Sequence, residues 1–220
     1  MQLTDIIKRV QRIFGDDDEV QIKIADIISW VSDGQMEIAR QTECLTKDKL
    51  FDFDPYTFTG FELPADFIME KRIAYYPRGF AVDKGNECPL AKTTLEHLDQ
   101  FLANPRASDE QVTQYYFWAN KLMLYPTPAN TAVAQMIKLW YVCAPDPLSQ
   151  MTDQIQIPQT MHEDLVRYAL IRARELNEDV EQAASMQNDL NTRLMQSRSE
   201  AFNPFKDQYP VIRDYAGDMW

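Results

Sequence analysis

The chain has 220 residues, of which 45% are hydrophobic and 11% aromatic, so it can bury a substantial core and is not generally disordered. Its formal net charge of −12 opposes loose binding to nucleic acid or anionic membranes, because attraction to phosphate requires a basic surface. Cys44, Cys88 and Cys143 lie far apart, which indicates thiols of a reducing compartment and neither a disulfide framework nor a metal knuckle.

The first 45 residues favour a helical hairpin. Apolar residues recur at helical spacing over Leu3–Phe14, and Gly15 with three aspartates ends this run. A second amphipathic run covers Ile24–Leu45 and contains Gly34, which costs about 1 kcal/mol relative to Ala in a helix. We interpret Gly34 as a site where another helix approaches closely; tolerance on a partly exposed face is the alternative.

The acidic run Asp16–Glu19 lacks the alternating oxygen ligands, the sixth-position glycine and the terminal glutamate of an EF-hand. It predicts a solvated turn.

Short aromatic and β-branched runs punctuated by Pro and Gly predict strands from Phe51 to Cys143, with a short helix at Thr94–Leu102. We expect Asn120-Lys121 to close a hairpin, because Asn tolerates the positive φ of a two-residue loop. The last expected strand would continue that hairpin as a third strand. The expected strands are Thr57–Leu63, Ile73–Tyr76, Phe80–Val82, Cys88–Lys92, Val112–Trp118, Leu122–Pro126 and Ala134–Val142.

Six aromatic residues of this region could form a stacking platform for single-stranded nucleic acid. Such platforms lie in basic grooves, and the region offers little beyond Lys121 and Lys138. Core and cross-strand packing is therefore the better interpretation for these aromatics, which are Tyr115, Tyr116, Phe117, Trp118, Trp140 and Tyr141.

Residues 159–201 predict a long C-terminal helix with a weak heptad seam. At 1.5 Å per residue such a helix would be roughly 60 Å long, more than a compact domain usually needs. Either it breaks near Asn177–Asp179, or it packs against the N-terminal hairpin and neighbouring subunits. The seam residues assigned to subunit packing are Ala173, Leu176, Val180, Ala183, Leu190 and Leu194.

The final segment, Phe202–Trp220, has no helical or strand period but is rich in large aromatics. Chain termini that make no contacts are usually disordered, whereas aromatic side chains seated in pockets of a partner are typical of strong interfaces. We therefore expect an extended arm that binds a neighbouring copy or another protein, with disorder as the alternative. The assigned contact residues are Phe202, Pro204, Phe205, Tyr209, Tyr215 and Trp220.

No catalytic signature stands out. His162-Glu163 begins like the zinc motif H-E-x-x-H, but residue 166 is Val, and His97 is isolated. A pair of carboxylates in a cleft stays open, since Asp and Glu are plentiful. We expect no catalytic residue, no cofactor and no metal.

Three segments together resemble the head-to-tail adaptor, or connector, proteins of tailed bacteriophages, particularly those of short-tailed phages. They are residues 14–40, residues 121–128 (K-L-M-L-Y-P-T-P) and residues 157–176, and the likeness extends over about residues 3 to 200. The resemblance implies a ring, commonly of twelve copies, that sits beneath the portal, joins it to the tail tube or nozzle and passes DNA through its lumen. It also implies a virion protein that is assembled in the host cytoplasm.

The expected fold is α+β: a helical bundle built from the N-terminal hairpin and the long C-terminal helix, a β-rich middle insertion and an extended C-terminal arm. The expected division is residues 1–50, 51–158, 159–201 and 202–220. With no signal peptide and no apolar run of about 18 residues, we expect a soluble protein without membrane contact. The alternatives are a tail accessory protein with peptidoglycan hydrolase activity and an interaction module outside the virion.

Overall fold

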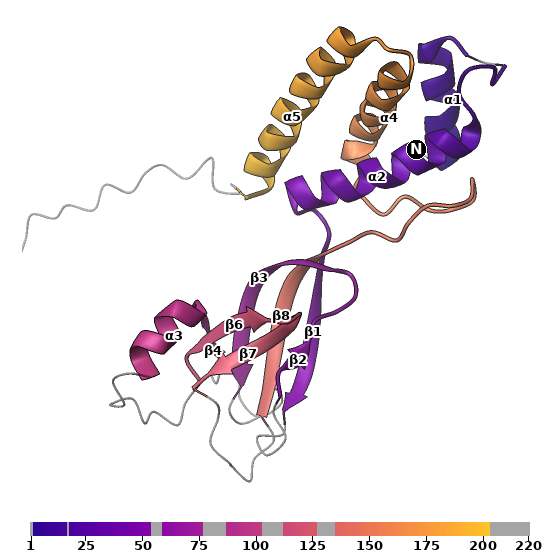
Figure 1. The fold of residues 1–220 in the computed structure, drawn as a ribbon. Coiled ribbons are helices and arrows are strands. Elements are labelled where there is room, and N and C mark those ends of the chain that lie inside the picture. The colour runs from indigo at the N-terminus through magenta and orange to yellow at the C-terminus, as the bar shows by residue number, and fades with distance from the viewer. Residues whose placement is uncertain are drawn as a thin grey trace, which may run out of the picture.

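The computed structural model describes residues 2–16, 18–53, 59–76, 87–102, 112–126 and 135–202. They form a helical bundle and a β-rich unit that is inserted between the second and third helices of the bundle (Figure 1). The expected α+β fold is confirmed. The bundle helices are α1 (Leu3–Phe14), α2 (Ile24–Thr42), α4 (His162–Leu176) and α5 (Val180–Phe202), and a short 3-10 turn (Gln159–Met161) precedes α4.

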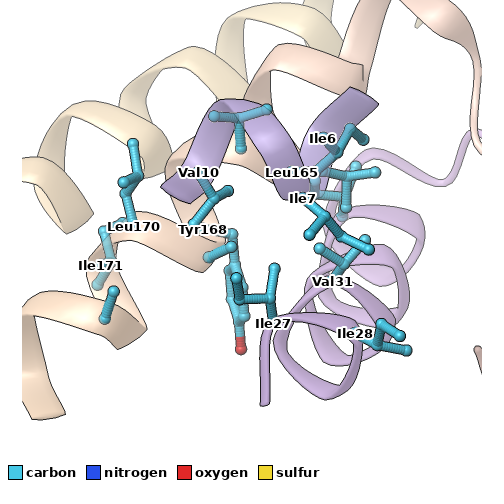
Figure 2. Packing of buried hydrophobic residues seen from close by; sticks show 14 of the residues in the cluster. Ile6, Ile7, Val10, Ile27, Ile28, Val31, Leu165, Tyr168, Leu170 and Ile171 are labelled. Atoms are coloured by element: carbon cyan, nitrogen blue, oxygen red, sulfur yellow. The ribbon is translucent and has the colours of Figure 1, made fainter. Parts of the chain in front are cut away.

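The apolar sides of α1, α2 and α4 meet in one core (Figure 2). Ile6, Val10, Ile27 and Leu165 are fully buried there. Gly15, at φ +85°, ends α1 in the left-handed conformation that glycine adopts without a steric penalty. The spacing that predicted the first two helices is thus the spacing of their buried faces.

At Gly34, α2 packs directly against Tyr168 of α4. A Cβ atom at residue 34 would lie 2.8 Å from Cδ1 and 3.0 Å from Cγ of Tyr168. The Tyr168 ring therefore occupies the volume that the side chain of any larger residue at position 34 would need. The interpretation of Gly34 as a site of close helix approach is confirmed.

The C-terminal helix breaks. Residues 177–179 form a turn between α4 and α5, with Glu178 at φ +61°. Arg193 Nε, in the second half of α5, donates a hydrogen bond of 3.0 Å to Asp164 Oδ1, near the start of α4. The two helices therefore lie antiparallel, and the expectation of one long helix over 159–201 is corrected in favour of the break near Asn177–Asp179.

The β unit consists of two four-stranded sheets whose facing sides share a second core. The strand order is β1-β8-β3-β4 in one sheet and β2-β7-β6-β5 in the other; only the β5–β6 pair is parallel among the described strands. A short helix, α3 (Leu95–Leu102), follows β5 as expected. The strands are β1 (Thr46–Phe53), β2 (Phe61–Glu62), β3 (Phe67–Tyr76), β4 (Cys88–Pro89), β5 (Ala91–Lys92), β6 (Gln114–Trp118), β7 (Lys121–Tyr125) and β8 (Gln135–Cys143).

The structure corrects two expectations about strand pairing. The turn of the β6–β7 hairpin is Ala119-Asn120, both at positive φ, and Lys121 already pairs with Trp118. Strand β8 does not continue this hairpin but lies in the other sheet between β1 and β3. Its Ile137 and Leu139 are fully buried in the β core, where they pack against the hairpin across the two sheets.

Other strand expectations were incomplete. Strand β1 was not expected, and β3 begins six residues before Ile73. The expected strand Phe80–Val82 lies outside the described residues.

Candidate functional site

The two histidines do not form a catalytic set. His162 is buried, with Nε2 3.2 Å from the carbonyl oxygen of Ile157, whereas His97 is exposed on α3. No group of three or more His, Cys, Asp or Glu side chains that could hold a metal ion occurs in the described part of the chain. His162 is therefore a structural residue that links the first turn of α4 to the segment before it.

A groove of about 570 Å³ lies beside the start of α1, where Asp153 and His162 are among its lining residues. The Asp153 carboxylate accepts hydrogen bonds from the backbone N–H groups of Ser149 (2.7 Å) and Gln150 (2.8 Å). These bonds hold the pKa of Asp153 below its ordinary value. The carboxylate is thus engaged in ordering its own loop.

The acidic run after α1 is a turn, organised by Asp16. Its carboxylate accepts the backbone N–H groups of Val20 (2.9 Å), Gln21 (2.9 Å) and Ile22 (2.7 Å). Burial would raise the pKa of Asp16, but the three hydrogen bonds outweigh it and lower the pKa. Asp16 fixes the connection between α1 and α2, and Asp17 lies outside the described residues.

The aromatic residues of the β unit divide between core and surface. Tyr115 and Tyr141 are buried in the β core, and Phe117 packs against it. The Trp140 ring contacts two cations: its centroid lies 4.8 Å from Lys138 Nζ and 5.1 Å from Arg72 Cζ. Trp118 is 60% exposed. Core packing therefore accounts for three of these rings, Tyr115, Phe117 and Tyr141.

The seam residues assigned to subunit packing occupy two kinds of place. Ala173, Ala183, Leu190 and Leu194 are buried in the core of their own bundle, because the reversal at residues 177–179 folds the seam back upon itself. Leu176 and Val180 flank this reversal and are 60% and 67% exposed. Of the six seam residues, only these two expose apolar surface that another chain could contact.

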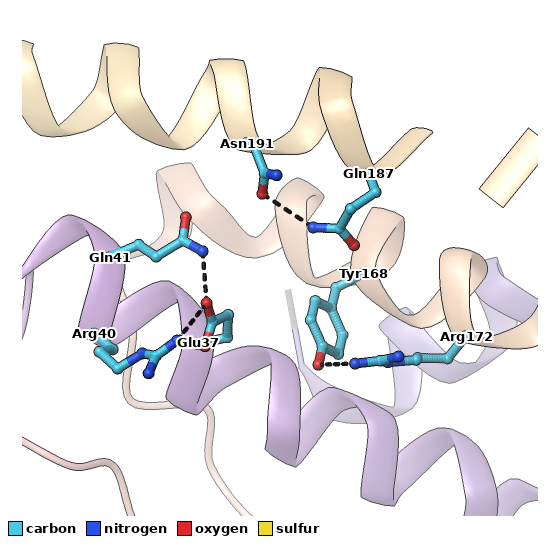
Figure 3. A network of polar contacts seen from close by, with 7 residues as sticks. All are labelled: Glu37, Arg40, Gln41, Tyr168, Arg172, Gln187 and Asn191. Carbon is cyan, nitrogen blue, oxygen red and sulfur yellow. Dashed lines mark hydrogen bonds and ion pairs between the residues drawn. The ribbon is translucent and has the colours of Figure 1, made fainter. Parts of the chain in front are cut away.

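Polar side chains of α2, α4 and α5 gather on one side of the bundle, and each hydrogen bond drawn among them lies within a single helix (Figure 3). Glu37 of α2 accepts hydrogen bonds from Gln41 Nε2 (2.6 Å) and Arg40 Nη2 (3.0 Å). Arg172 donates to the hydroxyl of Tyr168 at 3.0 Å, which fixes the ring that fills the space beside Gly34. Burial would raise the pKa of Glu37, but the hydrogen bonds from Gln41 and Arg40 outweigh this effect, and the pKa lies below its ordinary value.

The bundle and the β unit are joined by a buried carboxylate. Glu43, whose side chain is 5% exposed, follows α2 directly and forms ion pairs with Lys71 of β3 and Arg198 of α5. One side chain thus connects the end of α2, the last turns of α5 and the β unit. Sequence reasoning missed Glu43, since an acidic residue at a helix end is usually solvated.

The arm residues cannot be placed by the structure. Phe202 ends α5, and Pro204, Phe205, Tyr209, Tyr215 and Trp220 lie outside the described residues. The described bundle reaches the residue at which the expected arm begins.

A family model described as SU10 adaptor protein matches residues 1–208. The chain belongs to this family. The match spans the bundle, the inserted β unit and the start of the arm, and it confirms the resemblance to head-to-tail adaptors of tailed phages. A search of curated proteins finds no match.

As an adaptor, the protein is a structural connector of a phage and a component of the virion, which associates with other head and tail proteins. No helix in the described ranges is long and apolar enough to cross a bilayer.

Proposed function

We propose that this adaptor forms a closed ring, of about twelve copies, that joins the portal of a short-tailed phage to its tail tube or nozzle. The observation that carries the proposal is the family match over residues 1–208, which extends through every described element. DNA would pass through the lumen without sequence-specific binding, and the charge of −12 supports this because an acidic wall does not attract phosphates.

The architecture supports a two-ended connector. The bundle and the β unit lie at opposite ends of the protomer (Figure 1), so the two could engage different partners. We assign the arm, residues 202–220, to the portal or to a neighbouring copy, with its five large aromatics as anchors. The division of the chain that we propose is a bundle, an insertion that contains the eight described strands between Thr46 and Cys143, and the arm.

Native mass spectrometry of the adaptor with and without purified portal protein from the same phage tests the ring. We expect a closed ring, either alone or only on the portal. A protein that stays monomeric and does not bind the portal would refute the connector role.

Deletion of residues 203–220 tests the arm. We expect the deletion to abolish attachment to the portal while the circular dichroism spectrum stays unchanged, because both described cores form without these residues. Undiminished attachment would remove the arm from the proposal and leave the ring in place.

A further inference from the structure

The outward face of α1 is basic, although the chain as a whole is strongly acidic. Three of the twelve residues of α1 are Lys or Arg, against a single acid, Asp5. Asp5 is engaged at the helix start, where its Oδ2 accepts the backbone N–H of Gln2 at 2.9 Å. Lys8 and Arg12 are exposed one helical turn apart, and neither is paired with any described residue.

The outward face of α5 has the opposite character. Its two bases are each ion-paired within the chain, although about half exposed: Arg193 pairs with Asp164 of α4, and Arg198 with Glu43 at the end of α2. Glu181 and Asp189 are exposed, and no ion pair joins either of them to the described part of the chain. The exposed positions between these two acids are polar or small and carry no positive charge, including Gln182, Ser185 and Asn188.

These two faces lie on opposite sides of the bundle. Both α1 and α5 pack on α4, which lies between them in Figure 1. The buried sides of α1 and α5 both turn toward this shared core, so their exposed sides point away from each other. A protomer with complementary faces on opposite sides can join identical copies head to tail, and such a heterologous contact closes into a ring when the rotation permits.

We propose that, in the ring of the proposed function, the basic face of α1 (Lys8 and Arg12) packs against the acidic face of α5 (Glu181 and Asp189) of the adjacent copy. The partner is a second copy of this chain, and charge complementarity sets which faces meet and in which orientation. Exposed charges at this contact make its assembly sensitive to ionic strength. The interface of α5 is thus the side opposite its heptad seam.

Charge reversal tests the pairing. One variant carries K8E and R12E, a second carries E181K and D189K, and a third carries all four changes. The number of copies bound per portal ring is measured by native mass spectrometry with purified portal protein of the same phage. We expect each two-site variant to lose the closed ring, because like charges then face each other, and the four-site variant to regain it.

A control variant, K23E with K49E, changes the net charge as much as K8E with R12E does, at exposed positions away from both faces. It should assemble like the unmodified adaptor. Circular dichroism confirms that each variant is folded. If a charge-reversal variant does not fold, two single-cysteine variants replace it in the test. Chains that carry R12C are mixed with chains that carry D189C, assembled and oxidised, and a disulfide-linked pair is expected.

Three results would overturn the inference. Two-site variants that assemble like the unmodified adaptor, or a folded four-site variant that does not assemble, exclude this pairing but leave the ring intact. An unmodified adaptor that forms no ring on the portal refutes the proposed function itself and removes the neighbour that the pairing requires.

Discussion

Replacement of Gly34 by Ala asks whether helix propensity or packing controls the α2–α4 contact. The new Cβ would lie 2.8 Å from Cδ1 and 3.0 Å from Cγ of Tyr168. Rotation of the ring about its own axis leaves Cγ in place, so relief requires a shift of the side chain or of a helix. The hydrogen bond from Arg172 at 3.0 Å and the surrounding core resist such a shift.

The expected magnitude follows from two opposed effects. Ala gains about 1 kcal/mol over Gly in a helix interior. Overpacking of a well-packed core costs about 1–3 kcal/mol, and contact with the inner ring atoms places this site in the upper part of that range. The free energy of unfolding should therefore fall by about 1–2 kcal/mol, and for a chain of this length the Tm by about 2–8 °C.

Urea denaturation followed by circular dichroism measures the effect. Ser29→Ala, at an exposed position of the same helix, is the matched control and should raise the stability by a few tenths of a kcal/mol, about the difference in propensity. In a Tyr168→Leu background, Gly34→Ala should lose its penalty, since the ring atoms it meets are gone. If Gly34→Ala is as stable as the unmodified protein, propensity outweighs the contact and the packing argument is wrong.

Three further predictions concern the joint and the β unit. Glu43→Gln should lower the free energy of unfolding by about 1–2 kcal/mol, less than the loss of a fully buried pair because Arg198 is half exposed, as thermal unfolding can measure. Ala119→Gly should raise it by about 1 kcal/mol in urea denaturation, because Ala119 adopts φ +48°, where a Cβ is strained. Burial raises the pKa of Tyr75, Tyr115 and Tyr141 to about 12, and Asp66 contributes at Tyr141. Because folding favours the protonated phenols, their contribution is complete below pH 10 and is lost between about pH 10 and 12, which denaturation at pH 8 and pH 11 and absorbance at 295 nm can follow.

Each of these has a control. Asp48→Asn removes a pair with Lys138 in which the carboxylate is half exposed, and it should cost less than about 1 kcal/mol, so an equal loss in both variants would contradict a special role for Glu43. No gain from Ala119→Gly would mean that the turn is not strained. Complete ionisation of all tyrosines at pH 10.5 in the folded protein would contradict the raised pKa values.

The predictable parts of the fold are those where burial leaves a regular pattern in the sequence. Apolar spacing located α1 and α2, and Gly34 indicated a close contact because a Cβ at this residue would crowd the Tyr168 ring. Strand β1 was missed because it alternates Lys and Asp along an edge of its sheet, where only Phe51 is known to be buried. Periodicity could not reveal the position of β8, which depends on contacts between residues far apart in the chain.

The candidate surfaces were harder to predict. The heptad seam was visible in the sequence, but whether it faces its own chain or a neighbour depends on the turn at residues 177–179. The roles of Glu43 and of the arginines of α5 follow from distant partners, Lys71 and Asp164, that no local pattern reveals. The charge asymmetry of α1 could be read directly, since three bases cluster there in an acidic chain.

The insertion of the β unit into the bundle also sets an order of events during synthesis. Strands β1 and β8 are antiparallel partners, so the β unit can close once the ribosome has released residue 143. The apolar faces of α1 and α2 must wait for α4, which begins at His162, before they are covered. A nascent chain can therefore carry a finished β unit beside an unfinished bundle, and in that interval the apolar faces of α1 and α2 stay uncovered and open to aggregation.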